Sequence, residues 1–235
     1  NIKPENEAEF KRRLAEDVRS VPGVQNAAIT THVPLNGTSW GHEVHVDAIE
    51  GSSKFTYAGP AYFATMGIPL LTGRNFNDRD TNDSPLVLIV NQAFIRRFLG
   101  KSQPIGHLVH VMPEPQYPER TYQIIGTIPD TKYSDLREQT PPIAFVPAAQ
   151  LPVTAQGPGT AMMIASSGGP ADTTAIRRSI EAKDPTMVLQ FFDFQQSIRD
   201  TLVGDRMMAT LSGFFGLLAV LLVIVGLYGV LSYFV

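Results

Sequence analysis

Ser39 lies in a pattern that could present a nucleophile. Residues 37–41 read GTSWG, which matches the G-x-S-x-G pattern of a nucleophile elbow. That motif needs a strand followed by a helix, so that the turn exposes the serine hydroxyl beside an oxyanion hole. Here residues 42–46 (HEVHV) alternate like a strand instead. A hydrolase therefore stays an alternative that requires a histidine and an acid close to Ser39.

Four histidines occur in two pairs that could bind a metal ion. His42 and His45 point to opposite faces if they lie on a strand, because side chains alternate along a strand. His107 and His110 have the same spacing, and the same argument applies to them. We therefore expect no metal shared within either pair.

The acidic segment 78–83 (DRDTND) begins like a calcium-binding loop, with oxygen ligands at positions one, three and five. Position six is Asp83 rather than glycine, and position twelve is Ile89 rather than glutamate. Both diagnostic positions fail, so a solvated acidic turn is the better interpretation.

The composition excludes several classes of protein. The 235 residues carry a net charge of −3 with both signs mixed, so no basic field attracts nucleic acid. The absence of cysteine excludes a thiol nucleophile, a disulfide framework and a cysteine-based zinc site. No phosphate-binding or dinucleotide-binding glycine motif is present. We expect no catalytic residue, no cofactor, no metal and no nucleic-acid partner.

The charges are distributed very unevenly along the chain. All 41 Lys, Arg, Asp and Glu residues lie at or before Arg206, and residues 207–235 carry no formal charge. As a helix, residues 211–235 would be about 37 Å long, enough to cross a hydrocarbon core of about 30 Å. The sequence therefore predicts a C-terminal transmembrane helix at 207–235, in contact with the lipid bilayer.

Small residues recur on this helix at intervals of three, four or seven. Such spacing lets a second membrane helix approach closely, although Gly and Ala are also common in membrane helices generally. The candidate packing residues are Ser212, Gly216, Ala219, Gly226 and Gly229.

The preceding residues predict helices and strands in a definite order. An amphipathic helix at 5–20 and a strand at 24–33 open the chain. A strand, a helix and a strand at 161–165, 170–183 and 187–192 close the soluble part. The expected β-rich elements between them are strands at 40–49, 54–58, 86–90, 106–112, 121–128 and 143–146, one helical turn at 60–66, and a helix at 92–99 capped by Asn91.

The opening helix and strand lack the strand that a split βαβ layout places before them. We expect that strand upstream of Asn1, in the same full-length protein. Asp193 is expected to cap a last helix that runs into the membrane.

Residues 60–76 carry a recognisable segment. They read PAYFATMGIPLLTGRNF, followed by Asp80, and resemble "gYFetmGipLlaGRxFxxxD" of the extracytoplasmic core domain in MacB/FtsX-like ABC transporter permeases. Further pieces follow in the family's order: VNQAF at 90–94, PIG at 104–106, IIG at 124–126, KYSDLR at 132–137 and RMMATLSGFFG at 206–216. One departure is GTIPD at 126–130, where relatives usually read VGDV.

The resemblance implies an α+β fold. A split βαβ, porter-like α/β subdomain (1–59 and 140–206) would contain an inserted β-rich subdomain (60–139), followed by a C-terminal transmembrane helix (207–235). The resemblance also implies an inner-membrane permease with its soluble portion outside the cytoplasm, in the periplasm. Its partners would be a second permease subunit in a dimer, a separate ATP-binding cassette ATPase and, as a further candidate, an extracytoplasmic adaptor.

We therefore predict a non-catalytic permease segment that couples ATP-driven movement of the membrane helices to the outer domain, for efflux, export or mechanotransmission. The candidate coupling residues precede the membrane span: Ile198, Leu202 and Arg206. The alternative is a membrane-anchored sensor whose outer domain binds a small ligand in a concave pocket.

Overall fold

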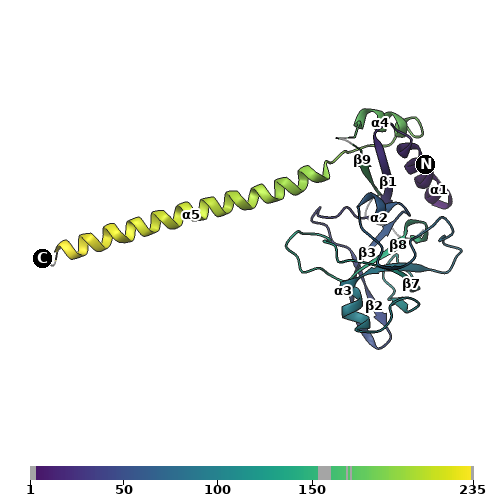
Figure 1. Ribbon diagram of the computed structural model, residues 1–235, viewed down its shortest axis with the longest axis horizontal. Helices are drawn as coiled ribbons and strands as arrows, with labels where there is room; N and C mark the ends of the chain where they lie inside the picture. Colours follow the sequence, from purple (N-terminus) through teal and green to yellow (C-terminus); the bar gives the residue numbers. More distant parts are fainter. Residues whose placement is uncertain (1–3, 153–159, 168, 170, 234–235) are drawn as a thin grey trace. The chain divides into compact units, whose positions relative to one another are not determined.

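The computed structural model describes residues 4–152, 160–167, 169 and 171–233 (Figure 1). The chain divides into two compact units, Asn1–Val188 and Leu189–Val235. The first unit mixes helices and strands, and the second is dominated by one long helix. The α+β class and the apolar C-terminal helix expected from the sequence are both confirmed.

Six strands of the first unit form a closed ring. They pair in the order β2-β6-β7-β5-β8-β3, and β3 pairs again with β2. The pairs β3–β8 and β5–β7 are parallel, and the other pairs of the ring are antiparallel. The ring strands are β2 (Gly41–Val46), β3 (Ile49–Ala58), β5 (Val87–Asn91), β6 (Leu108–Val111), β7 (Arg120–Ile128) and β8 (Ile143–Pro147).

Each ring strand contributes two alternate side chains to one buried cluster, which fills the interior of the ring. Leu88 and Val90 of β5 point inward, whereas Val87 and Ile89 join a second cluster on the other face. The short helix α2 (Tyr62–Thr65) contributes to that second cluster. Every residue of β5 is therefore buried, which confirms the buried strand predicted here. Full burial of one such side chain contributes roughly 1.5–3 kcal/mol.

A short helical segment follows β5 and packs Phe94 and Phe98 into the ring cluster. It consists of α3 (Gln92–Phe94) and a π-helical turn, η1 (Ile95–Leu99). Asn91 caps it, because its Oδ1 accepts a hydrogen bond from the Phe94 amide at 3.0 Å. The predicted helix at 92–99 and its cap are confirmed.

A smaller α/β layer adjoins the ring. β1 (Val24–Thr30) pairs antiparallel with β9 (Ala161–Ser166) and meets β3 at Thr30. α1 (Pro4–Arg19) and α4 (Thr173–Glu181) lie side by side at the end of the unit where β1 and β9 are drawn (Figure 1). The remaining short elements of the unit are β4 (Thr72–Gly73) and the 3-10 turn η2 (Ala148–Gln150).

The strand predicted at 187–192 is wrong. Residues 188–193 have no regular secondary structure, and Val188 and Phe192 are 91% and 80% exposed. A strand needs a neighbour to hydrogen-bond with, and no described strand pairs with this segment. Within the described residues, β9 pairs with β1 alone.

The division into a porter-like part and an insert at 60–139 stays a prediction. The ring draws β5, β6 and β7 from within 60–139 and β2, β3 and β8 from outside it. Both parts of the predicted division therefore contribute to one ring.

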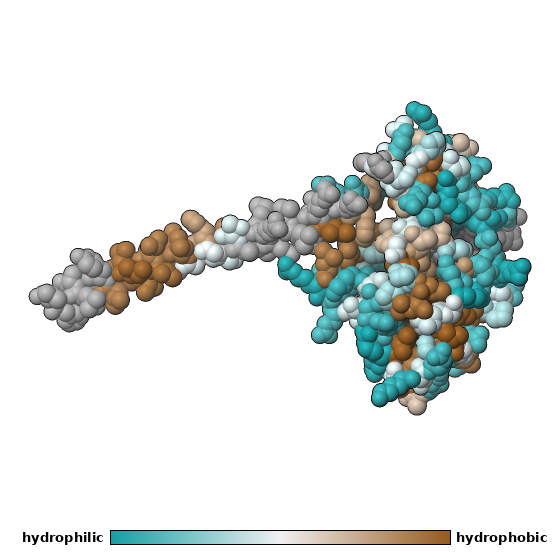
Figure 2. All heavy atoms as spheres, viewed as in Figure 1, coloured by the Kyte–Doolittle hydropathy of each residue, from teal (hydrophilic) through white to brown (hydrophobic). Residues whose placement is uncertain are grey.

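The second unit contains α5 (Phe194–Tyr233), a continuous helix of 40 residues. The Asp193 carboxylate accepts a hydrogen bond from the Gln196 amide at 3.1 Å, which confirms the predicted cap. Residues Thr210–Leu227 have a mean hydropathy of 2.5, so this stretch is long and apolar enough to cross a membrane. Figure 2 shows the same stretch as a hydrophobic band along the helix.

Candidate functional site

Arg74 and Asp80, both in the segment that resembles the permease family, form a two-pronged ion pair. Arg74 Nη1 and Nη2 donate to the two carboxylate oxygens of Asp80 at 2.8 and 2.7 Å, and the Asn77 amide donates to Oδ2 at 2.9 Å. Asp80 is only 5% exposed. Burial by itself raises the pKa of Asp80, but the hydrogen bonds and the Arg74 charge lower it overall. Both oxygens already have partners, so the geometry does not favour a calcium ligand here.

The backbone beside this ion pair approaches β7 very closely. Gly73 of β4 pairs with Gly126 of β7. A Cβ on Gly73 would lie 2.1 Å from the Ile125 carbonyl oxygen, and one on Gly126 would lie 2.6 Å from the Arg74 carbonyl oxygen. The segment that resembles the permease family therefore packs its backbone directly against β7 of the ring and has a structural role there.

The KYSDLR segment has a similar structural role. The Tyr133 hydroxyl lies 2.8 Å from the Phe55 carbonyl oxygen and 3.0 Å from that of Trp40. Burial raises the pKa of Tyr133 to about 12. The Glu138 carboxylate accepts hydrogen bonds from the Tyr133 and Ser134 amides, which fixes the loop.

Ser39 does not have the surroundings of a nucleophile. It precedes β2 rather than a helix, and its hydroxyl accepts a hydrogen bond from Lys54 Nζ. No described histidine or carboxylate hydrogen-bonds to Ser39. The strand that the sequence predicts after GTSWG is confirmed, and with it the mismatch to a nucleophile elbow.

The histidines occupy three environments. His42 lies inside the ring, 1% exposed, with Nδ1 3.0 Å from Glu114 Oε1. His45 is on the outer face of the same strand, as strand alternation predicts. For His107 and His110 the premise of a shared strand does not hold, and the expectation that they share no metal stays a prediction. His107 precedes β6, so strand alternation does not apply to it, and both side chains line one hollow.

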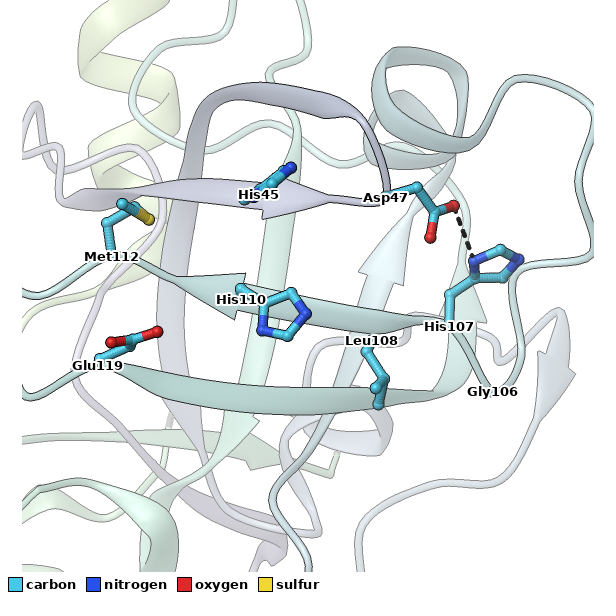
Figure 3. Close-up of a pocket in the computed structure, with 8 residues that line it drawn as sticks. All are labelled: His45, Asp47, Gly106, His107, Leu108, His110, Met112 and Glu119. Atoms are coloured by element: carbon cyan, nitrogen blue, oxygen red, sulfur yellow. Dashed lines mark ion pairs between the residues drawn. The ribbon is translucent and has the colours of Figure 1, made fainter.

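This hollow lies on the outer face of the ring, over β2 and β6, and has a volume of about 630 Å³ (Figure 3). His107 Nδ1 lies 3.3 Å from Asp47 Oδ2 at one end. Figure 3 shows Met112 and Glu119 at the other end, with His45 and His110 between. Most of the lining side chains carry metal-donor atoms, although no group of three or more His, Asp or Glu in the described residues is arranged to hold a metal ion.

The grouping of His45 with His110 was not predicted, because the spacing of histidines within one strand does not reveal neighbours on another strand. The relevant neighbours come from different strands: His45 of β2 lies directly opposite His110 of β6. The sequence does show that His45 and His110 each occupy an outward position in a strand whose residues alternate between apolar and polar. It does not show that these two strands pair.

The predicted membrane-packing residues all lie on α5. Ser212, Gly216, Ala219 and Gly226 are exposed, and nothing lies within 4 Å of a Cβ built at Gly216 or Gly226. Gly229 is on the same helix, with its surroundings outside the described residues.

The predicted coupling residues also lie on α5, N-terminal to the apolar stretch. Ile198 is half-buried, whereas the side chains of Leu202 and Arg206 fall outside the described residues. The roles of all these residues stay predictions.

Comparison with known proteins identifies related sequences and folds. Residues 2–183 match the family model described as the MacB-like periplasmic core domain. The periplasmic region of MacB from Actinobacillus actinomycetemcomitans is similar in structure, with a TM-score of 0.53 and 17% identity, over 74% of this chain and 73% of that one. The extracellular domain of the noncanonic ABC-type transporter YknZ from Gram-positive bacteria gives a TM-score of 0.54 and 14% identity, over 78% and 88% of the two chains. No curated protein matches the chain.

Proposed function

Because this chain belongs to the family of MacB-like periplasmic core domains of ABC transporter permeases, we propose that it transmits movement between the membrane and the domain outside it. ATP hydrolysis would take place in a separate ATP-binding cassette ATPase. The transmitted movement would serve efflux, export or mechanotransmission. The permease itself would lie in the inner membrane.

The observation that carries this proposal is the continuity of α5. The helix runs without a break from Phe194, through Ile198, Leu202 and Arg206, into the apolar stretch Thr210–Leu227. Its first sixteen residues rise about 24 Å at 1.5 Å per residue. An unbroken helix keeps one hydrogen-bonded backbone on both sides of the membrane boundary. Displacement of the membrane segment is therefore passed on to the residues that precede it.

The side chains of Thr210–Leu227 are exposed throughout. In a membrane such a helix contacts lipid on one side and other helices where small residues allow close approach. We assign the face containing Ser212, Gly216, Ala219 and Gly226 to helix packing, either within the permease or with a second permease subunit in a dimer. An extracytoplasmic adaptor remains a candidate partner of the outer domain.

The test uses the full-length permease with its ATPase in lipid nanodiscs. This chain has no cysteine, so one cysteine placed at the exposed Lys101 can carry a spectroscopic label once cysteines elsewhere in the protein are removed. The label is read with and without ADP–vanadate, in the wild type, in Leu202→Pro and in the matched control Leu202→Ala.

Proline removes a helical hydrogen bond and clashes with the preceding turn, whereas alanine preserves the helix. We expect the label to respond in the wild type and in Leu202→Ala. In Leu202→Pro the response should disappear while ATP hydrolysis continues. An undiminished response in Leu202→Pro contradicts the proposal, and a wild-type label that responds only to an added small molecule favours the sensor alternative.

A further inference from the structure

Three strands place a row of polar side chains across the outer face of the ring. His45 of β2 lies opposite His110 of β6, and His110 in turn lies opposite Thr121 of β7. Directly opposed residues of antiparallel strands project from the same face, with Cβ atoms roughly 4.5–5.5 Å apart. The register therefore brings two imidazoles and a hydroxyl together without any contribution from a loop.

The two imidazoles are close enough to share one ion. Their ring centroids are 6.3 Å apart, with 54° between the ring planes. A metal about 2.0–2.1 Å from an imidazole nitrogen lies roughly 3 Å from the ring centroid, so one ion can bridge centroids up to roughly 6 Å apart when the two nitrogens lie on opposite sides of it. The two imidazole side chains must therefore rotate toward each other to bind one ion.

The third residue of the row orients one of the ligands. His110 Nδ1 lies 2.9 Å from Thr121 Oγ1. When Nδ1–H donates to this hydroxyl, the lone pair of Nε2 is free to bind a metal. Metal-binding histidines in general use their second nitrogen in this way, and the partner fixes the tautomer and the ring orientation.

The surroundings supply a compensating negative charge. Glu119 and Met112 flank the two imidazoles, and Asp47 lies at the other end of the hollow (Figure 3). Imidazole and thioether donors select transition metals of borderline softness over Mg²⁺ or Ca²⁺, and Cu²⁺ binds such sites most tightly among the divalent ions of the first row.

From this row we infer that His45 and His110 bind a divalent transition-metal ion, Cu²⁺ most tightly, with His110 binding through Nε2 and water completing the coordination. Thr121 acts as a positioning residue for His110. The ion joins β2 to β6, which is one of the pairings that close the ring. Binding to the folded state alone also raises stability. This inference does not depend on the proposed transmission of movement.

The experiment titrates the full chain in detergent with Cu²⁺ and follows electron paramagnetic resonance and the thermal unfolding midpoint. We expect one Cu²⁺ per chain with splitting from two nitrogens, and a higher midpoint with metal. His45→Ala and His110→Ala should each weaken binding at least tenfold and leave the splitting of one nitrogen. Thr121→Val should weaken binding about tenfold, the lower end of the effect of losing such a partner.

His107→Ala is the matched control, because His107 lines the same hollow but pairs with Asp47. It should bind Cu²⁺ like the wild type. Metal-free melting of every variant shows that it is folded. The inference is overturned if the wild type binds no stoichiometric Cu²⁺, if the double variant His45→Ala/His110→Ala binds as well as the wild type, or if His107→Ala loses as much affinity as His45→Ala.

Discussion

The imidazole of His32 lies flat on the phenol ring of Tyr133, with 3.8 Å between the ring centroids and 5° between the ring planes. His32 Nε2 also lies 3.1 Å from the Tyr133 carbonyl oxygen. His32 follows β1 and Tyr133 follows β7. This contact therefore joins the segment that follows β1 of the α/β layer to the loop that follows β7 of the ring.

The first prediction concerns pH. Burial lowers the pKa of His32 below its ordinary value of 6.5, against the opposing effect of the Tyr133 carbonyl. The folded state therefore binds fewer protons than the unfolded state as the pH falls below 6.5, and stability declines in that window. His32→Phe keeps a stacked ring and removes the proton. Its stability should change less than that of the wild type between pH 7 and pH 5.

Urea unfolding in detergent measures this difference, with Trp40, the single tryptophan, as the fluorescent reporter. Groups other than His32 titrate in both proteins and cancel in the comparison. Equal changes in stability for the two proteins across this pH range contradict the prediction.

The second prediction concerns the Arg74–Asp80 pair. Both carboxylate oxygens of Asp80 accept hydrogen bonds. In Asp80→Asn one of these oxygens becomes an NH₂ group, which donates instead of accepting, so a buried polar group loses its partner. The expected loss of stability is about 1–3 kcal/mol.

Because the pKa of Asp80 is lowered, the contribution of the carboxylate is present above pH 3.8 and is lost as the pH falls through its folded pKa. Urea unfolding at pH 7 and pH 3 should therefore show a smaller gap between the variant and the wild type at pH 3. A gap of the same size at both values counts against this role.

The third prediction compares two glycines that both have a positive φ. Gly73 and Gly67 have φ of +81° and +67°, so alanine brings backbone strain at both positions. At Gly73 the new Cβ also meets the Ile125 carbonyl oxygen, whereas at Gly67 nothing lies within 4 Å. We expect Gly67→Ala to cost about 1 kcal/mol and Gly73→Ala clearly more. Thermal unfolding gives the loss of stability for each variant, and the difference between the two losses reports the steric clash at Gly73. Equal losses would show that β4 can shift to relieve the clash without cost.

The fourth prediction tests the packing face of α5. Gly216→Leu places a large side chain on the face that contains Ser212 and Ala219, so it should weaken helix association. Gly213→Leu makes the same substitution about 100° around the helix from Ser212 and should have little effect. Sedimentation of the full chain in detergent measures the oligomeric state. If Gly216→Leu and Gly213→Leu have the same oligomeric state, the face containing Ser212 and Ala219 is not the packing face.

Local features were predictable from the sequence, because their signals come from neighbouring residues. The caps at Asn91 and Asp193 depend on one side chain and the next few amides, and both occur as predicted. The buried strand β5 is a continuous apolar run, which needs no knowledge of its partners.

Long-range pairings were not predictable in the same way. The ring closes through β2–β6 and β3–β8, which join segments far apart in the chain, and side-chain alternation does not specify which strands pair. The row His45–His110–Thr121 depends on one such pairing, β2–β6, together with the pairing of the consecutive strands β6 and β7. The failed strand at 187–192 has the same origin, because its apolar residues predict a strand and say nothing about a partner.

The position of β8 in the ring has a consequence for biosynthesis. β8 lies between β5 and β3, yet it is the last ring strand to be synthesised. Until residues 143–147 emerge, β3 and β5 each present an open edge with apolar side chains, and such edges invite pairing with other chains. Contacts between distant segments also slow folding. The nascent domain therefore passes through a stage at which a chaperone that covers strand edges would raise its yield.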